Sequence, residues 1–260
     1  MEYRILGPIR VLDEEGETFL NARKVQALLA VLLIRSNQIV SVDQLIAEIW
    51  HDNPPRRASA SLHVYVSQVR KFLSRPGRSG SQLLTRVPGY LLTLGEDTLD
   101  VHEFQQRMNA GRDLYLLGRH EEACRELTVA LDAWRGPALG ELSGDGPIVR
   151  GFVAWAEEAR LECLELQIET QLALGLHRQL VGRLFQLISE VPMRETLYRQ
   201  LMLALYQADR PADALRVYQS ARVTLNDELG VEPCRALRDL HHAILAGDVR
   251  GDSEVSALAS

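Results

Sequence analysis

The chain has 260 residues, a hydrophobic content of 46% and a formal net charge of −6 at pH 7. This length allows one or two domains with buried cores. No uncharged apolar stretch reaches the roughly 18 residues of a membrane span, and the N-terminus lacks the features of a signal peptide. The three cysteines, Cys124, Cys163 and Cys234, are widely spaced. This pattern favours reduced thiols in a cytoplasmic protein over a disulfide framework or a zinc site.

The charges are unevenly distributed along the chain. Residues 1–95 carry 12 basic and 8 acidic side chains, whereas residues 96–260 carry 17 and 27. No acidic residue occurs from Asn53 to Gly95, although seven basic residues do: Arg56, Arg57, Arg70, Lys71, Arg75, Arg78 and Arg86. A basic segment within an acidic protein indicates a local site for a polyanion. Chance clustering of solvated side chains is the alternative.

The first fifty residues predict short strands followed by two helices. The strands are expected at residues 3–7, 9–13 and 18–22, with a turn at residues 14–16. Apolar side chains at helical spacing then predict a helix over residues 23–34. Ser41 and Gln44 have the spacing of a capping box, so a second helix should begin at residue 42. The sequence Asn53-Pro54-Pro55 ends it.

A third helix is predicted over residues 57–74, and its two faces differ in chemistry. On a helical wheel one apolar stripe contains Ala58, Leu62, Val66, Val69 and Leu73. The opposite face is small, polar and basic, with no carboxylates; it carries Arg57, Ala60, Val64, Ser67, Gln68 and Lys71, with Ser61 and Arg70 at its edges. A solvated face normally mixes charges of both signs, so this face favours a binding surface.

A β-hairpin is predicted over residues 82–94, with Arg86 at its bend. The bend contains a Pro-Gly pair, in which Pro pre-sets φ and Gly tolerates a positive φ. A lone arginine at a hairpin often serves solubility alone. Here the hairpin follows three short helices, which is the order of a winged helix. In that fold the third helix fills the major groove and the hairpin arginine reaches an adjacent minor groove.

From Leu99 onward the periodicity is helical. Three segments share the outline of the first half of a helix-turn-helix repeat: residues 117–134, 174–188 and 208–222. Gly175 and Asp209 occupy equivalent turn positions 34 residues apart, which is the tetratricopeptide period. Residues 135–151 are rich in Gly and Pro and predict a loop, and residues 248–260 predict a disordered tail. A protein-binding repeat array is therefore expected, with a plain helical bundle as the alternative.

The sequence contains no motif of the common catalytic or cofactor-binding sites. A Walker A sequence, a GxGxxG turn, a GxSxG elbow and an HExxH pair are all absent. His241 and His242 are adjacent on a helix, so their rings diverge and cannot share a metal ion. We expect no catalytic residue, no cofactor and no metal.

Several unrelated motifs occur in one order: IWHDNPP, SLHVYVSQVRKFL, LLTRVPGYLL, LDVHEF, the repeats, and LNDELGVEPCRALRDLHHAIL. In this the chain resembles the Streptomyces antibiotic regulatory protein family over about residues 1–247. The resemblance implies a mainly α protein. Residues 1–95 would form a winged helix-turn-helix of the response-regulator output type. Residues 96–247 would form an all-α, tetratricopeptide-like bacterial transcriptional activation domain.

The resemblance also implies a function. Family members activate gene clusters for secondary metabolites such as antibiotics. They bind direct repeats in double-stranded promoter DNA near the −35 element, as a homodimer or tandem pair, and recruit RNA polymerase holoenzyme including its sigma subunit. A cytoplasmic, nucleoid-associated protein that does not contact membranes is expected. The alternative is a helical-repeat adaptor that binds protein and has no DNA-binding activity.

The expected DNA-binding residues combine the basic segment with the DNA-facing pattern of the family: Arg56, Arg57, Ser61, Val64, Ser67, Gln68, Arg70, Lys71, Arg86 and Tyr90. By the same resemblance, a loop containing His51, Asp52 and Arg56 would contact polymerase. Two positions depart from the family. Gln68-Val69 replaces a common Arg-Leu pair, which affects base preference, and His51 stands where Gly is frequent.

Overall fold

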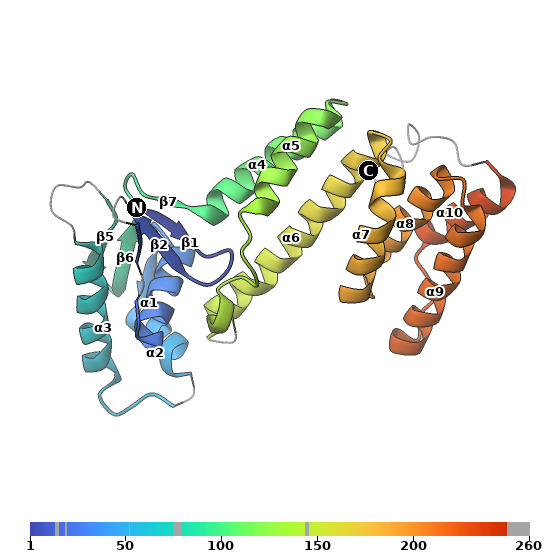
Figure 1. Cartoon of the computed structure of the whole chain (residues 1–260). Coiled ribbons are helices and arrows are strands. Elements are labelled where there is room, and N and C mark those ends of the chain that lie inside the picture. Colours follow the sequence, from blue (N-terminus) through green and yellow to red (C-terminus); the bar gives the residue numbers. More distant parts are fainter. Residues whose placement is uncertain (14–15, 19, 52, 75–79, 144–145, 249–260) are drawn as a thin grey trace. The chain divides into compact units, whose positions relative to one another are not determined.

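The computed structural model describes residues 1–13, 16–18, 20–51, 53–74, 80–143 and 146–248 (Figure 1). Asp52, part of the expected turn at residues 14–16 and the tail from residue 249 lie outside the described residues. The chain divides into two compact units. The first contains Met1–Asn109 and Thr128–Glu162, and the second contains Ala110–Leu127 and the chain from Cys163 onward. Each unit is described by itself.

The first unit contains two small sheets. One has the strand order β3-β2-β1-β7, in which only β1 and β7 are parallel; it is built from β1 (Glu2–Arg4), β2 (Arg10–Asp13), β3 (Gly16–Thr18) and β7 (Thr98–Leu99). The other is antiparallel with the order β4-β6-β5, and contains β4 (Ile39–Ser41), β5 (Gln82–Arg86) and β6 (Gly89–Thr93).

The sequence-based strands need correction at three places. The strand expected at residues 18–22 is wrong, because β3 ends at Thr18 and residues 20–22 are not extended in a sheet. Strands β4 and β7 are absent from the sequence-based expectation. They contain three and two residues, which is too short for an alternating pattern, and their pairing partners are distant in the chain.

Three helices of the first unit pack against one another: α1 (Arg23–Ile34), α2 (Val42–Trp50) and α3 (Ala58–Leu73). The expected bounds of α1 and α2 are confirmed. The capping box of α2 is also present, because Ser41 Oγ accepts from the Gln44 N–H and the Gln44 side chain accepts from the Ser41 N–H. Fully buried leucines of all three helices form the core: Leu28, Leu29, Leu32, Leu33, Leu45 and Leu62.

The hairpin β5–β6 is confirmed, but glycine is required at position 89 for a different reason from the positive φ that the sequence suggests. Gly89 lies within β6 opposite Ser41 of β4, and its φ is not among the positive values. A Cβ at this position would lie 1.8 Å from the Val40 carbonyl oxygen. Close approach of β4 therefore requires glycine here. The bend itself is Val87-Pro88, whose peptide bond is cis.

The rest of the chain is helical: α4 (Asp100–Leu116), α5 (His120–Asp132), the short 3-10 helix η1 (Gly140–Leu142), α6 (Pro147–Ala173), α7 (His177–Glu190), α8 (Glu195–Gln207), α9 (Pro211–Leu229) and α10 (Arg235–Ala246). The loop expected over residues 135–151 is shorter than predicted. Its last five residues belong to α6, which begins at Pro147, a residue that is well tolerated at the first position of a helix.

Three turns join helices in the same way, at Gly118, Gly175 and Asp209, with φ values of 71°, 79° and 61°. In each turn this residue donates to the carbonyl three residues earlier, and the next N–H donates to the carbonyl five residues earlier. The expected equivalence of Gly175 and Asp209 is thereby confirmed. The segments taken as first halves of repeats are instead the turn and the second helix of each pair.

The core of the second unit is formed by side chains of the five consecutive helices α6, α7, α8, α9 and α10. Its fully buried side chains include Ile168, Leu184, Leu201, Met202 and Leu237. Helix α8 packs against α7, α9 and α10. This all-α arrangement is the tetratricopeptide-like architecture expected from the sequence. None of the helices in the described ranges is long and apolar enough to cross a membrane.

Candidate nucleic-acid interface

Helix α3 turns one face into the core and the opposite face outward. Its buried residues are Ala58, Leu62, Val66, Val69 and Leu73, which is the stripe expected from the sequence. The exposed residues of the opposite face are Arg57, Ala60, Val64, Ser67, Gln68 and Lys71. Val64 retains 54% exposure although it is apolar. Burial of one stripe thus fixes which side chains the helix presents outward.

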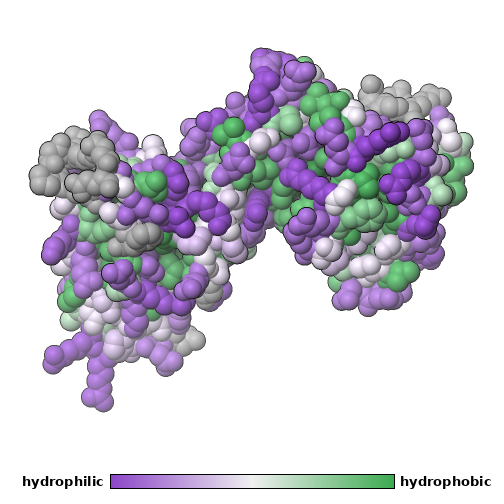
Figure 2. All heavy atoms as spheres, in the orientation of Figure 1, coloured by the Kyte–Doolittle hydropathy of each residue, from purple (hydrophilic) through white to green (hydrophobic). Residues whose placement is uncertain are grey.

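The cations of this region are exposed. Arg56, Arg57, Lys71 and Arg86 all lie at the surface. None of them forms an ion pair with a residue in the described part of the chain. Hydrophilic side chains project from the loop between α2 and α3, at the lower left of Figure 2. The surface is therefore positive without intramolecular compensation from the described carboxylates.

The hairpin β5–β6, which is the wing of the winged helix, presents its bend to solvent. Arg86 ends β5 and is exposed, and Val87 has an exposed fraction of 92%. The sequence reasoning considered only the arginine of this bend and missed Val87. The signal was available, because Val87 lies in the bend of the predicted hairpin, and such connecting segments run over the protein surface.

Arg70 and Tyr90 are placed differently from the other expected DNA-binding residues. Tyr90 has only 5% exposure and lies in β6. Arg70 is half-buried; its Nε donates to the Leu83 carbonyl over 3.0 Å and its Nη2 donates to Thr85 Oγ1 over 2.7 Å. The Arg70 guanidinium also lies 5.8 Å from the centre of the Tyr90 ring. The structure therefore turns Arg70 toward the hairpin and buries Tyr90 within it.

Two serines complete the face. Ser61 is half-buried and Ser67 is exposed. Ser67 Oγ donates to the His63 carbonyl over 3.0 Å, one turn earlier in α3. The hydroxyl oxygen still has lone pairs that can accept a hydrogen bond.

The loop before α3 begins at a strained residue. His51 ends α2 with φ 52° and ψ −128°, in the region that favours glycine. Residues 53–57 are exposed, while Asp52 lies outside the described residues. Arg57 precedes α3 and makes no side-chain cap. The first turn of α3 therefore offers main-chain N–H groups close to two arginines.

Aromatic packing anchors the end of α2. The rings of Trp50 and Tyr65 stack with their centroids 5.7 Å apart. Lys24 Nζ lies 5.1 Å from the centre of the Trp50 ring. These contacts join α1, α2 and α3 beside the loop that begins at His51.

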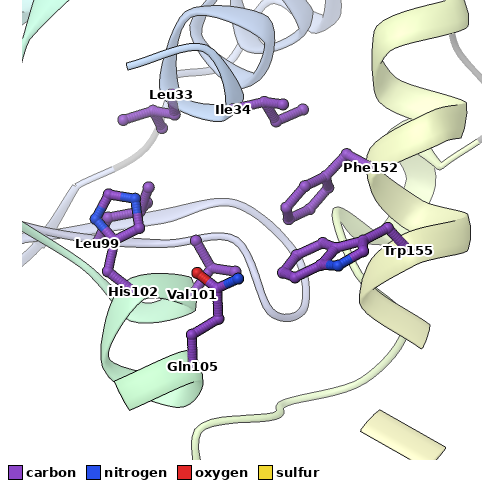
Figure 3. A pocket seen from close by; sticks show the side chains of 8 residues that line it. All are labelled: Leu33, Ile34, Leu99, Val101, His102, Gln105, Phe152 and Trp155. Carbon is purple, nitrogen blue, oxygen red and sulfur yellow. The ribbon is translucent and has the colours of Figure 1, made fainter. Parts of the chain in front are cut away.

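The described residues form no cluster suited to binding a metal ion. No group of three or more His, Cys, Asp or Glu residues in the described ranges could hold a metal ion. Figure 3 shows a hollow of about 240 Å³ in the first unit, lined by Leu33, Ile34, Leu99, Val101, His102, Gln105, Phe152 and Trp155. This volume is below that of typical ligand pockets, and only His102 and Gln105 are polar.

Two family descriptions match the chain in tandem. Residues 16–102 match "Transcriptional regulatory protein, C terminal", and residues 99–245 match "Bacterial transcriptional activator domain". A winged helix followed by a helical activator domain defines a class of bacterial transcriptional regulators. This chain belongs to that class, and specifically to the Streptomyces antibiotic regulatory protein family.

The relatives support this assignment along almost the whole chain. Regulatory protein DnrI of Streptomyces peucetius is 35% identical over 269 residues, covering 100% of this chain and 98% of the relative. The transcriptional regulatory protein EmbR of Mycobacterium tuberculosis is 36% identical, and the match covers 94% of this chain. The chain spans 63% of EmbR's length. A solved structure of EmbR with a low-affinity phosphopeptide has a TM-score of 0.89 at 35% identity, covering 95% of this chain and 65% of that chain.

Proposed function

We propose that this regulator is a sequence-specific activator that binds promoter DNA through α3 and the wing. The observation that supports this proposal is the exposed face of α3. This face presents Arg57 and Lys71, and the hairpin presents Arg86, and none of the three has an acidic partner among the described residues. A surface of this kind attracts a polyanion through phosphate contacts. We further propose that residues 1–95 bind DNA and residues 96–247 carry the activating contacts.

Direct readout would come from the middle of α3. Gln68 is exposed, and its amide can donate and accept at once, which matches N6 and N7 of adenine. Val64 lies one turn earlier on the same face and would pack on a thymine methyl group. Lys71, Arg56 and Arg57 would contact phosphates, with Ser61 and Ser67 as further polar contacts.

The wing would supply the second contact. Arg86 would enter the minor groove next to the major groove that α3 occupies, since a narrow A/T-rich minor groove concentrates negative potential. Val87 at the same bend would make van der Waals contact there.

Activation would require contacts beyond DNA. Two protomers on direct repeats about one helical turn (~10–10.5 bp) apart would lie on the same face of the duplex. The loop with His51, Asp52 and Arg56 would then contact the sigma subunit of RNA polymerase near the −35 element. Several weak contacts from a tandem pair gain strength through effective concentration. By its family, the chain would act on a gene cluster for a secondary metabolite such as an antibiotic.

The test is binding of the full chain to duplexes recovered from a random-sequence pool. DNA binding predicts that the pool converges on one sequence and that log K falls linearly with log salt concentration. A protein-binding adaptor predicts no convergence and no stable complex at physiological salt. Failure to recover any duplex would overturn the proposal.

A further inference from the structure

Arg70 is turned toward the wing and not outward with the rest of the α3 face. We propose that it is a positioning residue, which fixes the wing relative to α3 so that both can contact DNA at once. This inference rests on the proposed DNA-binding function. It assigns Arg70 a different role from the phosphate contact that the exposed Lys71 would make.

The guanidinium binds two points of one strand. Its Nε donates to the Leu83 carbonyl over 3.0 Å, and its Nη2 donates to Thr85 Oγ1 over 2.7 Å. Arginine presents these donors in a rigid planar fork, so the two bonds together define the orientation of β5 relative to α3. Lysine has a single flexible ammonium group and cannot reproduce this geometry.

The third contact extends the link to β6. The Arg70 guanidinium lies 5.8 Å from the centre of the Tyr90 ring, and Tyr90 is the cross-strand partner of Thr85. Tyr90 is itself buried, with only 5% exposure, although it occurs in the DNA-facing family pattern. One side chain of α3 therefore holds both strands of the hairpin.

The position of this link gives it a role at the wing tip. Strand β5 is the outer strand of its three-stranded sheet, and in the described part of the chain it pairs with β6 alone, so its other edge has no strand to hold it there. Arg86 immediately follows Thr85 in β5. Holding Thr85 against α3 therefore limits where Arg86 can lie, which lowers the entropy cost of placing it in the minor groove.

The first test measures hydrogen exchange of the main-chain amides from Leu84 to Leu91 in the free, full-length chain. Arg70→Lys and Thr85→Val should each accelerate this exchange by about tenfold, since each removes a charge-assisted hydrogen bond. Thr85→Val keeps every cation and preserves the β-branched shape. The matched control, Lys71→Met, removes the neighbouring cation and should leave exchange in the wing unchanged. Unchanged exchange in both Arg70→Lys and Thr85→Val would overturn the proposal.

The second test compares binding to selected duplexes with A/T-rich and G/C-rich flanks. Arg70→Lys and Thr85→Val should reduce the A/T preference while keeping the wild-type salt slope. Lys71→Met should keep the flank preference and reduce the slope by about 0.9, the value of one phosphate contact. If Arg70→Lys keeps the wild-type flank preference, the positioning role is wrong. If the wild-type chain recovers no duplex, the proposed function fails, and the exchange experiment still decides whether Arg70 holds the wing.

Discussion

The carboxylate of Glu48 in α2 accepts hydrogen bonds from the main-chain N–H groups of Ile148 and Val149, over 2.5 and 3.4 Å. Glu48 has an exposed fraction of only 2%. It meets the first turn of α6, where free N–H groups and the helix dipole favour a negative charge. The end of α2, which leads into the loop that begins at His51, is thereby joined to the start of α6. Both segments belong to the same compact unit.

The first prediction concerns Gly146, which lies against this contact. A Cβ at Gly146 would lie 2.6 Å from the Cα atom of Glu48, so Gly146→Ala must displace main-chain atoms. We expect a loss of about 1–3 kcal/mol in the free energy of unfolding, measured by urea denaturation. The matched control is Gly151→Ala in α6, where a Cβ would meet nothing within 4 Å. That variant should gain about 0.5–1 kcal/mol from helix propensity. Equal stability of the two variants would contradict the contact.

The second prediction uses the strained backbone of His51. With φ 52° and ψ −128°, this residue adopts a conformation that is nearly restricted to glycine. His51→Gly should therefore stabilise the chain by about 1 kcal/mol, as measured by denaturant midpoint at constant slope. His51→Ala retains a Cβ and should give no such gain. Stabilisation by alanine as large as by glycine would show that loss of the imidazole, and not backbone strain, is responsible.

The third prediction concerns base readout by Gln68. Gln68→Ala should cost about 1–3 kcal/mol of binding free energy at one base pair of the selected site and leave binding to variants of that base pair nearly unchanged. Competition binding with single-base variants of the duplex measures this. A uniform loss over all duplexes would mean that Gln68 makes no direct contact with a base.

The fourth prediction separates DNA binding from activation. Arg56→Ala combined with Asp52→Ala should lower transcription in a purified system several-fold, because the loop would lose its polymerase contact. Promoter binding should lose no more than the one phosphate contact proposed for Arg56. The slope of log K against log salt concentration should therefore fall by no more than about 0.9. The control is Lys71→Ala, which should lower affinity without changing transcription at saturating protein. Full activation by the loop variant would exclude this loop as the contact.

The fifth prediction concerns the reactivity of the cysteines. Burial raises the pKa of the Cys163 thiol to about 12, and the residue is fully buried. Its thiolate population is then about a thousandfold lower than that of an ordinary thiol, so a maleimide should modify it only after unfolding. Cys234 is exposed and should react in the native chain. Mass spectrometry of the labelled peptides distinguishes the two. Labelling of native Cys163 at the rate of Cys234 would contradict its burial.

Much of the local structure follows from the sequence, because it depends on contacts between near neighbours. The capping box at Ser41, the bounds of α1 and the buried stripe of α3 all depend on residues within a few turns of one another. The outward face of α3 followed by default, since a helix that buries one stripe must expose the other. The equivalent turns at Gly175 and Asp209 were predictable because each is closed by hydrogen bonds to carbonyls only three and five residues earlier in the chain.

The tertiary structure decided what depends on segments far apart in the chain. Strand β4 exists only because β6 pairs with it across some fifty residues, and Gly89 is required by that same approach. No local pattern signals that Arg70 turns toward Leu83 and Thr85, since its position at the edge of the basic face permits either direction. Likewise, the sequence around Glu48 predicts an ordinary exposed helix residue. Its actual partner, the start of α6, is a hundred residues away in the chain. Periodicity shows which side of a helix is buried, but the partner of each polar group is set only when distant elements meet.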